Sequence, residues 1–271
     1  WKIPESTFAQ VSIRQCLDMT SGLGYGDRKT ACSGFPQSAL KIPTLLDVLT
    51  GSLPAINDAV RQLTSPGSCY AYSGAGYMVL QQWLEDFTGQ NFSQLMTNQL
   101  LEPLGMADSH FSSPIDECLK THVVRGCTEW QYMPTTASGG MWTTSHDVAQ
   151  LLIAISAAYR EESGAFLSKI LIDEMLTPNQ FNYGLGVTID SSDKHILLAK
   201  NGQNNAHHHE IILFPSLGSG LVVMTNHAGA MPFLESVTGA IAQYFQWPLH
   251  AFSFDELGTR SAKTELPRIQ T

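Results

Sequence analysis

The residues best suited to chemistry surround Tyr72, within residues 66–77. A Pro-Gly pair and several glycines bracket this tyrosine, and these residue types favour a tightly constrained loop. A helical pattern follows at once, with apolar residues at intervals of three and four, and Gly89 is placed to end it. The pattern predicts a tyrosine held at a helix N-terminus, where the helix dipole favours a phenolate. A loop tyrosine that only packs against its neighbours is the alternative.

A second candidate is the run of histidines that ends in a glutamate, residues 207–210. On a strand, His207 and His209 would face the same side and could share a metal ion. No third ligand stands at a telling spacing, so we expect no metal site and interpret the run as the polar rim of a pocket. A metal-dependent hydrolase that uses His207 and His209 remains an alternative.

The elements that must position these residues change character along the chain. Helical patterns come first, at residues 11–20, 43–49, 77–88, 91–101, 146–159 and 167–176. Strand patterns follow at residues 183–190, 195–200, 210–214 and 221–225, and a last helical pattern covers residues 232–245. Helices, then an antiparallel meander, then a helix predict an α+β fold with helices against one sheet.

Composition limits the function. The chain has 271 residues, of which 43% are hydrophobic and 14% are charged, and this composition supports a sizeable core. Its formal net charge is −9 and its basic residues are scattered, which argues against binding to nucleic acid or to an anionic membrane surface. No apolar run is long enough for a transmembrane segment. We expect a single domain over residues 1–271, with residues 248–271 as a polar C-terminal extension.

The chain has 5 cysteines and no Cys-x-x-Cys pair, which argues against a zinc ribbon. Cys16 stands among apolar neighbours and is interpreted as a small buried hydrophobe. Cys118 and Cys127 flank a loop and could form a disulfide if the protein is exported. Free thiols in a reducing compartment fit the same sequence.

Several short segments of the sequence occur in a characteristic order and spacing. They lie at residues 11–23, 72–77, 101–106, 139–144, 183–186 and 221–226. Together they resemble the serine hydrolases related to class C β-lactamases and penicillin-binding proteins, a family that also holds D,D-peptidases and esterases. The resemblance spans residues 1–247. It implies the β-lactamase/transpeptidase-like fold, which is α+β with an antiparallel sheet flanked by helices and with a helical lobe.

The resemblance also implies a reaction and a site of three parts. A serine would form an acyl-enzyme with a β-lactam, a D-alanyl peptide or a small ester, and water would hydrolyse it without a cofactor. The parts are a Ser-x-x-Lys helix with the nucleophile, a Tyr-x-Asn loop and a Lys-Thr-Gly-like strand triplet. A serine hydroxyl is a poor nucleophile until a base takes its proton, and a neighbouring lysine and tyrosine can share that task.

Tyr72 matches the tyrosine of the second part. Gly74 stands where many relatives carry Asn, and we expect Gly74 to lie in the substrate-binding wall. The change removes an amide that could hold the lysine or contact the substrate. It weakens the case for β-lactam hydrolysis more than the case for acyl transfer in general.

The strand triplet matches Lys200, Asn201 and Gly202. Lys200 would direct a cation towards a substrate carboxylate, and Asn201 and Gly202 would line the substrate. The backbone amide of Gln203 would be one donor to the oxyanion. An ordinary charged strand end is the alternative for Lys200.

The resemblance places the Ser-x-x-Lys motif upstream of residues 20–23. Two matches to the motif occur elsewhere, at residues 38–41 and 191–194. Neither begins a long apolar helix, which is what would bring the serine and the lysine together on one face, so we interpret both as chance. We therefore expect the nucleophile to lie upstream of Trp1 and the 271-residue chain alone to be inactive.

A non-catalytic member of the same fold that binds peptide or cell-wall fragments is the alternative from another function class. The expected partners are a small-molecule or peptide substrate and the missing N-terminal segment. The expected location is periplasmic or secreted.

Overall fold

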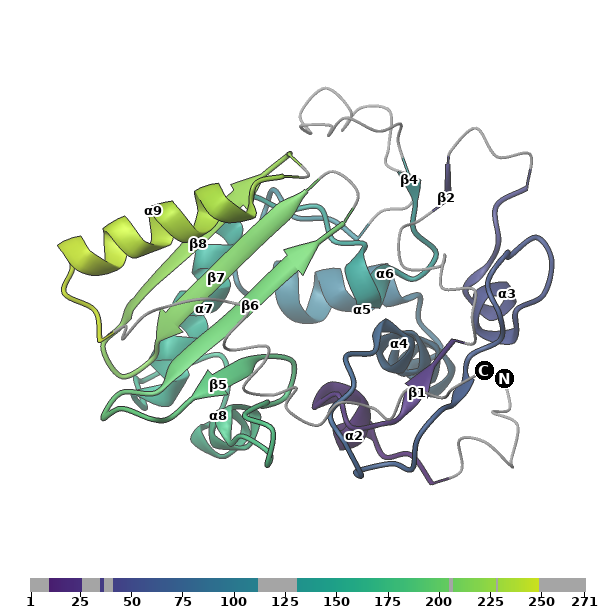
Figure 1. Ribbon diagram of the computed structural model, residues 1–271, viewed down its shortest axis with the longest axis horizontal. Helices are drawn as coiled ribbons and strands as arrows, with labels where there is room; N and C mark the ends of the chain where they lie inside the picture. The colour runs from purple at the N-terminus through teal and green to yellow at the C-terminus, as the bar shows by residue number, and fades with distance from the viewer. Residues whose placement is uncertain are drawn as a thin grey trace.

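The structure is a computed structural model that describes residues 10–25, 35–36, 41–111, 131–204, 207–227 and 229–248. It has a helical lobe and a lobe built on a sheet (Figure 1). The helical lobe contains α2 (Ile13–Leu17), α3 (Leu45–Thr50), α4 (Gly74–Thr88), α5 (Phe92–Met96), the π-helical turn η2 (Thr97–Leu101) and α6 (Thr136–Gly139). Short antiparallel pairs accompany them: β1 (Leu23–Gly24) with β3 (Arg61–Gln62), and β2 (Phe35–Pro36) with β4 (Gln131–Tyr132).

The second lobe contains, among the described residues, a 4-stranded antiparallel sheet in the order β5-β6-β7-β8. Its strands are β5 (Thr188–Asp190), β6 (Leu197–Gln203), β7 (His208–Phe214) and β8 (Ser219–Thr225). Helices α7 (Ser145–Tyr159) and α8 (Lys169–Leu176) lie against one face, and α9 (Met231–Tyr244) covers the other (Figure 1). The predicted antiparallel sheet flanked by helices, with a helical lobe, is therefore present.

Alternation along the strands gives the sheet two separate cores. Leu198 and its cross-strand partner Leu213 pack with Leu152 and Ile172 of the α7 and α8 layer. Residues one step along, such as Phe214, turn to the α9 side. Since strand side chains alternate in direction, this burial decides which face every other residue of β6 and β7 occupies.

The helical lobe is organised around α4. Ser73 caps its N-terminus by accepting a hydrogen bond from the Gly76 amide, and Gly89 ends it with a φ of 67°. Its buried face packs Met78 and neighbouring apolar residues against α2 and α3. Cys16 of α2 is 3% exposed in this core, as predicted from its apolar neighbours, and burial raises the pKa of its thiol to about 12.

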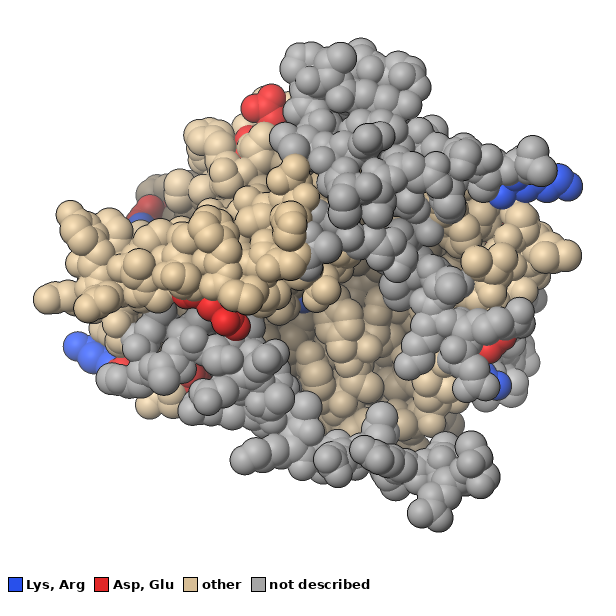
Figure 2. All heavy atoms as spheres, turned by 45° about the horizontal axis from the view of Figure 1, so that its top comes forward, with Lys and Arg blue, Asp and Glu red and all other residues tan. Residues whose placement is uncertain are grey.

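Charged side chains do not concentrate on the face drawn in Figure 2. The figure shows a hollowed area of mostly uncharged residues, with the described Lys, Arg, Asp and Glu side chains scattered around it. None of the described helices is both long and apolar enough to cross a membrane.

The two lobes are joined at the C-terminal end of α2. The Leu17 carbonyl accepts hydrogen bonds from the Gly186 amide at 3.0 Å and from the Tyr77 hydroxyl at 3.2 Å. The Asp18 carbonyl accepts another from the Asn179 side chain at 3.2 Å. These backbone acceptors tie α2, α4 and residues 179–186 into one unit.

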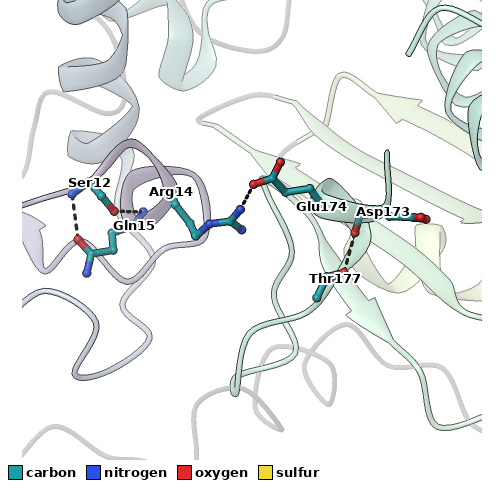
Figure 3. A network of polar contacts seen from close by, with 6 residues as sticks. All are labelled: Ser12, Arg14, Gln15, Asp173, Glu174 and Thr177. Carbon is teal, nitrogen blue, oxygen red and sulfur yellow. Dashed lines mark hydrogen bonds and ion pairs between the residues drawn. The ribbon is translucent and has the colours of Figure 1, made fainter. Parts of the chain in front are cut away.

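An ion pair crosses the same boundary. Figure 3 shows Arg14 of α2 reaching Glu174 of α8, beside the box in which Ser12 and Gln15 cap α2. Both members of the ion pair are about half exposed, so solvent screens the pair and its contribution to stability is small. In this box the Ser12 hydroxyl accepts a hydrogen bond from the Gln15 amide.

Element boundaries differ from the sequence patterns mainly at residues 183–190. The pattern predicts one strand there, but the regular strand β5 covers only Thr188–Asp190. The Gly184 amide instead bonds the Val187 carbonyl in a turn, and Gly186 has a φ of 92°. A Cβ on Gly184 would lie 2.4 Å from the Met175 carbonyl oxygen. Glycine, which has no Cβ, therefore lets this segment pack closely against α8.

A cluster of polar side chains lies buried between β7 and α9. His208 is 2% exposed, Glu210 1% and Thr238 0%. No hydrogen-bond partner for either Glu210 carboxyl oxygen is found among the described residues. Burial raises the pKa of Glu210 to about 7, and the negative charge of Glu235 raises it further. The nearby Thr238 hydroxyl acts in the opposite direction and lowers this pKa, although the two side chains do not form a hydrogen bond.

This burial predicts a loss of stability as the pH rises. Between the unperturbed value of 4.5 and about 7, the folded chain keeps the Glu210 proton while the unfolded chain loses it. The free energy of unfolding should therefore fall across this window, by about 2–3 kcal/mol from this group. Urea denaturation of the protein at pH 5, 6, 7 and 8 measures the slope.

Glu210→Gln should flatten that slope, because the amide does not titrate. Glu102→Gln, at an exposed position, is the matched control and should keep the wild-type slope. An unchanged slope in Glu210→Gln would show that this carboxyl does not hold its proton in the fold.

Candidate functional site

Tyr72 lies on the loop that leads into α4, between two anchored residues. The Ala71 amide donates to the Met19 carbonyl at 2.9 Å, and the Ser73 hydroxyl donates to the Leu23 carbonyl at 2.6 Å. The loop is therefore held at both sides of the tyrosine, whose side chain is 63% exposed. The predicted position at a helix N-terminus is present, and the anchoring explains how the ring keeps its place despite its exposure.

Lys200 lies near the end of β6, on the sheet face occupied by Leu198. Its ammonium group lies 5.0 Å from the centroid of the Tyr72 ring and donates to the Asn201 carbonyl at 2.9 Å. Burial lowers the pKa of Lys200 to about 8, since a charged amine is less well solvated there. Two residues 128 positions apart in the numbering, and from different lobes, thus meet at one place.

The other residues of the strand triplet divide between the two faces of the sheet. Register pairs Gly202 with His209 on the Lys200 side, whereas Asn201 and Gln203 alternate to the α9 side. Asn201, Gly202 and the following Gln203 are all exposed. In the described sheet β5 pairs only as far as Ala199, so one edge of residues 200–203 has no strand partner there. Gly74 is the first residue of α4 and is half-buried.

Tyr70 and Tyr77, which flank the loop and are half-buried, form a group with the buried Tyr183. The Tyr70 ring packs on Tyr183 at 5.3 Å between centroids and on Phe181 at 6.4 Å. Burial raises the pKa of Tyr70 to about 12, and it also raises the pKa of Tyr77 and of Tyr183. These phenols stay protonated at neutral pH, so they serve as packing and as hydrogen-bond donors. Sequence reasoning missed this cluster, although Tyr70 and Tyr77 stand in the same stretch as Tyr72.

The predicted polar rim has the geometry of a wall beside Gly202. A Cβ on Gly202 would lie 3.8 Å from Cδ2 of His209, so this imidazole borders the triplet. The His207 and His209 rings are 6.0 Å apart, and the Trp142 ring meets His207 edge-on at 6.1 Å. Trp142 was not predicted as a site residue. The sequence feature that could have indicated it is its place in residues 139–144, one of the stretches that carry the family resemblance.

The protonation state of His209 also follows from its burial. Burial, followed by the neighbouring His207 and His208, lowers the pKa of His209 to about 4, so this ring is neutral at neutral pH. Within the described part of the chain, no group of three or more His, Cys, Asp or Glu side chains is arranged to hold a metal ion. The wall is therefore aromatic, and its His209 ring is uncharged at neutral pH.

The serine motifs are not brought to Tyr72 by the described residues. Ser191 and Lys194 are exposed in the bend between β5 and β6, not on a helix. Ser38 lies outside the described residues, and so do Cys118 and Cys127. The predictions that concern those three residues stay predictions.

Comparison with known proteins gives the family. A model of the Beta-lactamase family matches residues 1–245. The structure is similar to D-amino acid amidase from Ochrobactrum anthropi SV3, with a TM-score of 0.68 and 20% identity over 90% of this chain and 75% of that one. It is also similar to a penicillin binding protein from Bacillus halodurans, with a TM-score of 0.66 and 20% identity over 86% of this chain and 73% of that one.

Sequence identity to a known protein is higher over one shorter stretch of the chain. The D-alanyl-D-alanine-carboxypeptidase/endopeptidase AmpH of Escherichia coli K12 is 31% identical over 86 residues, which are 31% of this chain and 22% of that protein. The chain therefore matches less than a quarter of that relative's length. The solved structures confirm the predicted β-lactamase/transpeptidase-like fold. With a family model that covers residues 1–245 of 271, the chain belongs to the β-lactamase family.

Proposed function

We propose that the protein is a serine hydrolase that cleaves an amide or ester bond of a D-amino-acid or D-alanyl substrate through an acyl-enzyme. The observation that carries the proposal is the contact between Lys200 and Tyr72, 5.0 Å from ammonium to ring centroid. The relatives support the substrate class, since their names include a D-amino acid amidase and a D-alanyl-D-alanine-carboxypeptidase. Fluorophosphonate labelling, described below, tests it.

Each part of the site has a role in this reaction. Tyr72 carries the proton between the serine and the leaving group, because a cation nearby favours its phenolate. Lys200, mostly charged at neutral pH with a pKa of about 8, pairs with the substrate carboxylate. The Gln203 amide is one oxyanion donor, and Asn201 and Gly202 line the substrate along the edge of β6.

The nucleophile belongs to a segment outside the described residues, and we propose that it precedes Trp1 on a Ser-x-x-Lys helix. Gly74, in place of Asn, leaves the tyrosine loop without a side-chain amide. This favours linear amides and esters over β-lactams as substrates. Export to the periplasm or outside the cell accords with a D-alanyl substrate and belongs to the same proposal.

A non-catalytic protein that binds D-alanyl peptides is the second candidate. It is favoured by one observation: the described residues include no Ser-x-x-Lys helix beside Tyr72. Both candidates use Lys200 for the carboxylate, so a serine adduct is what separates them.

Labelling with a fluorophosphonate separates the two candidates. We expect a protein that also carries the Ser-x-x-Lys helix before Trp1 to form one adduct, on that serine, and the 271-residue chain to form none. Mass spectrometry of tryptic peptides locates the adduct. A longer protein that is never labelled and never hydrolyses a D-amino-acid amide would reject the enzyme, and an adduct on Ser38 would reject the upstream nucleophile.

Tyr72→Phe should lower turnover of a D-amino-acid amide by about a hundred-fold in the active protein, since it removes the oxygen that transfers the proton and keeps the ring. Tyr70→Phe is the matched control from the same stretch and should change turnover by less than about threefold, because its phenol stays protonated. Steady-state kinetics of both variants decide the role; near-normal turnover by Tyr72→Phe would remove it.

Carboxylate binding should depend on the charge of Lys200. The affinity for N-acetyl-D-alanyl-D-alanine should fall about tenfold between pH 7 and pH 9, because Lys200 loses its proton near pH 8. Calorimetric titration of the 271-residue chain gives the dissociation constants. Lys200→Arg should hold its affinity to pH 9, and Lys200→Met should bind weakly at every pH; equal affinity of Lys200→Met and wild type would contradict the assignment.

A further inference from the structure

The wall beyond Gly202 consists of rings from two separate parts of the chain. His209 borders Gly202 on β7, His207 precedes that strand, and Trp142 comes from the segment before α7. Their rings follow one another at 6.0 Å and 6.1 Å between centroids. All three residues are half-buried, so each keeps some surface accessible to solvent.

The arrangement of the rings forms a corner. The His207 and His209 planes differ by 31°, whereas Trp142 stands at 86° to His207. Aromatic groups pack on one another at centroid separations of about 4.5–7 Å, in offset-stacked or edge-to-face geometry. A corner of this kind presents both a face and an edge to a third ring. His209 carries no charge at neutral pH, which favours an uncharged ring over an ion.

The corner and Lys200 lie on the same face of the sheet, at different points along it. Gly202 is two residues beyond Lys200 on β6, which is about 7 Å along a strand. The Lys200 ammonium lies over the Tyr72 ring and donates to the Asn201 carbonyl. A ligand that meets both must therefore have a carboxylate at one end and a ring at the other.

We propose that His207, His209 and Trp142 form an aromatic subsite of the proposed active site, and that the preferred ligand is an N-aroyl D-amino acid or peptide with a free carboxylate. The carboxylate lies at Lys200 and the aromatic acyl group lies in the corner. This inference rests on the proposed function only for the carboxylate end. The ring end stands on the geometry of the three side chains.

Calorimetric titration of the 271-residue chain with N-benzoyl-D-alanine and N-acetyl-D-alanine tests the subsite, because these ligands share their charge and differ in the ring. We expect the benzoyl ligand to bind about tenfold more tightly. Trp142→Ala and His209→Ala should each reduce that preference below about threefold. Trp142→Phe keeps a ring and should retain most of it. His195→Ala, at the opposite end of β6, is the control and should leave the preference intact.

Lys200→Met separates this inference from the proposed function. It should weaken both ligands and leave their ratio near tenfold. A wild-type preference for the benzoyl ligand, together with equal affinity of Lys200→Met and wild type for each ligand, would keep the subsite and reject the role of Lys200 in the proposed function. Equal binding of the two ligands by the wild-type chain, or an undiminished preference in folded Trp142→Ala and His209→Ala, would overturn the subsite.

Discussion

The site depends on the burial of Leu198 and Leu213 against α7 and α8. These two residues are cross-strand partners, and their burial fixes the face of each strand. Because side chains alternate along β6, Lys200 and Gly202 lie on the same face of the sheet as Leu198. His209 of β7 is the cross-strand partner of Gly202 and therefore lies on this face as well. A shift of one residue in β6 would turn Lys200 to the α9 side and put Asn201 in its place, whereas a shift of one residue in β7 would turn His209 to the α9 side. The apolar core of the sheet lobe therefore decides which polar groups can reach Tyr72.

A second constraint brings the lobes together. Backbone carbonyls at the end of α2 accept hydrogen bonds from Gly186, Tyr77 and Asn179, which come from both lobes. The bonds from Gly186 and Asn179 cross between the lobes, and each contributes about 0.5–1.5 kcal/mol to holding the lobes together. The loop of Tyr72 is tied to the same region through Met19 and Leu23. The distance between Lys200 and Tyr72 is thus set by contacts that neither residue makes.

Sequence periodicity predicted most of the fold because most elements carry local signals. Gly89 was predicted to end the helix that follows Tyr72, and the structure has the C-cap of α4 at this residue. The exception, residues 183–187, has strand-like alternation but packs its glycines against α8, which only the tertiary structure reveals. Likewise, Tyr72 and Lys200 were predicted from the family resemblance, whereas their contact depends on how two lobes dock.

The residues that escaped sequence analysis share one property: their roles come from partners distant in the chain. Trp142 gains meaning only beside His207, and Tyr70 only beside Phe181 and Tyr183. In the sequence Glu210 is the last residue of the histidine run, whereas in the structure it is buried under α9 beside Thr238. Nothing in the spacing of these residues distinguishes them from ordinary loop aromatics or from a solvated charge.

The central claim is that Lys200 and Tyr72, from different lobes, occupy one site. Nuclear Overhauser effects between the ε-methylene protons of Lys200 and the ring protons of Tyr72 measure this directly in the 271-residue chain. With the ammonium 5.0 Å from the ring centroid, the account predicts clear cross-peaks between these protons. Their absence, in a sample that shows the expected contacts between Ala71 and Met19, would contradict it.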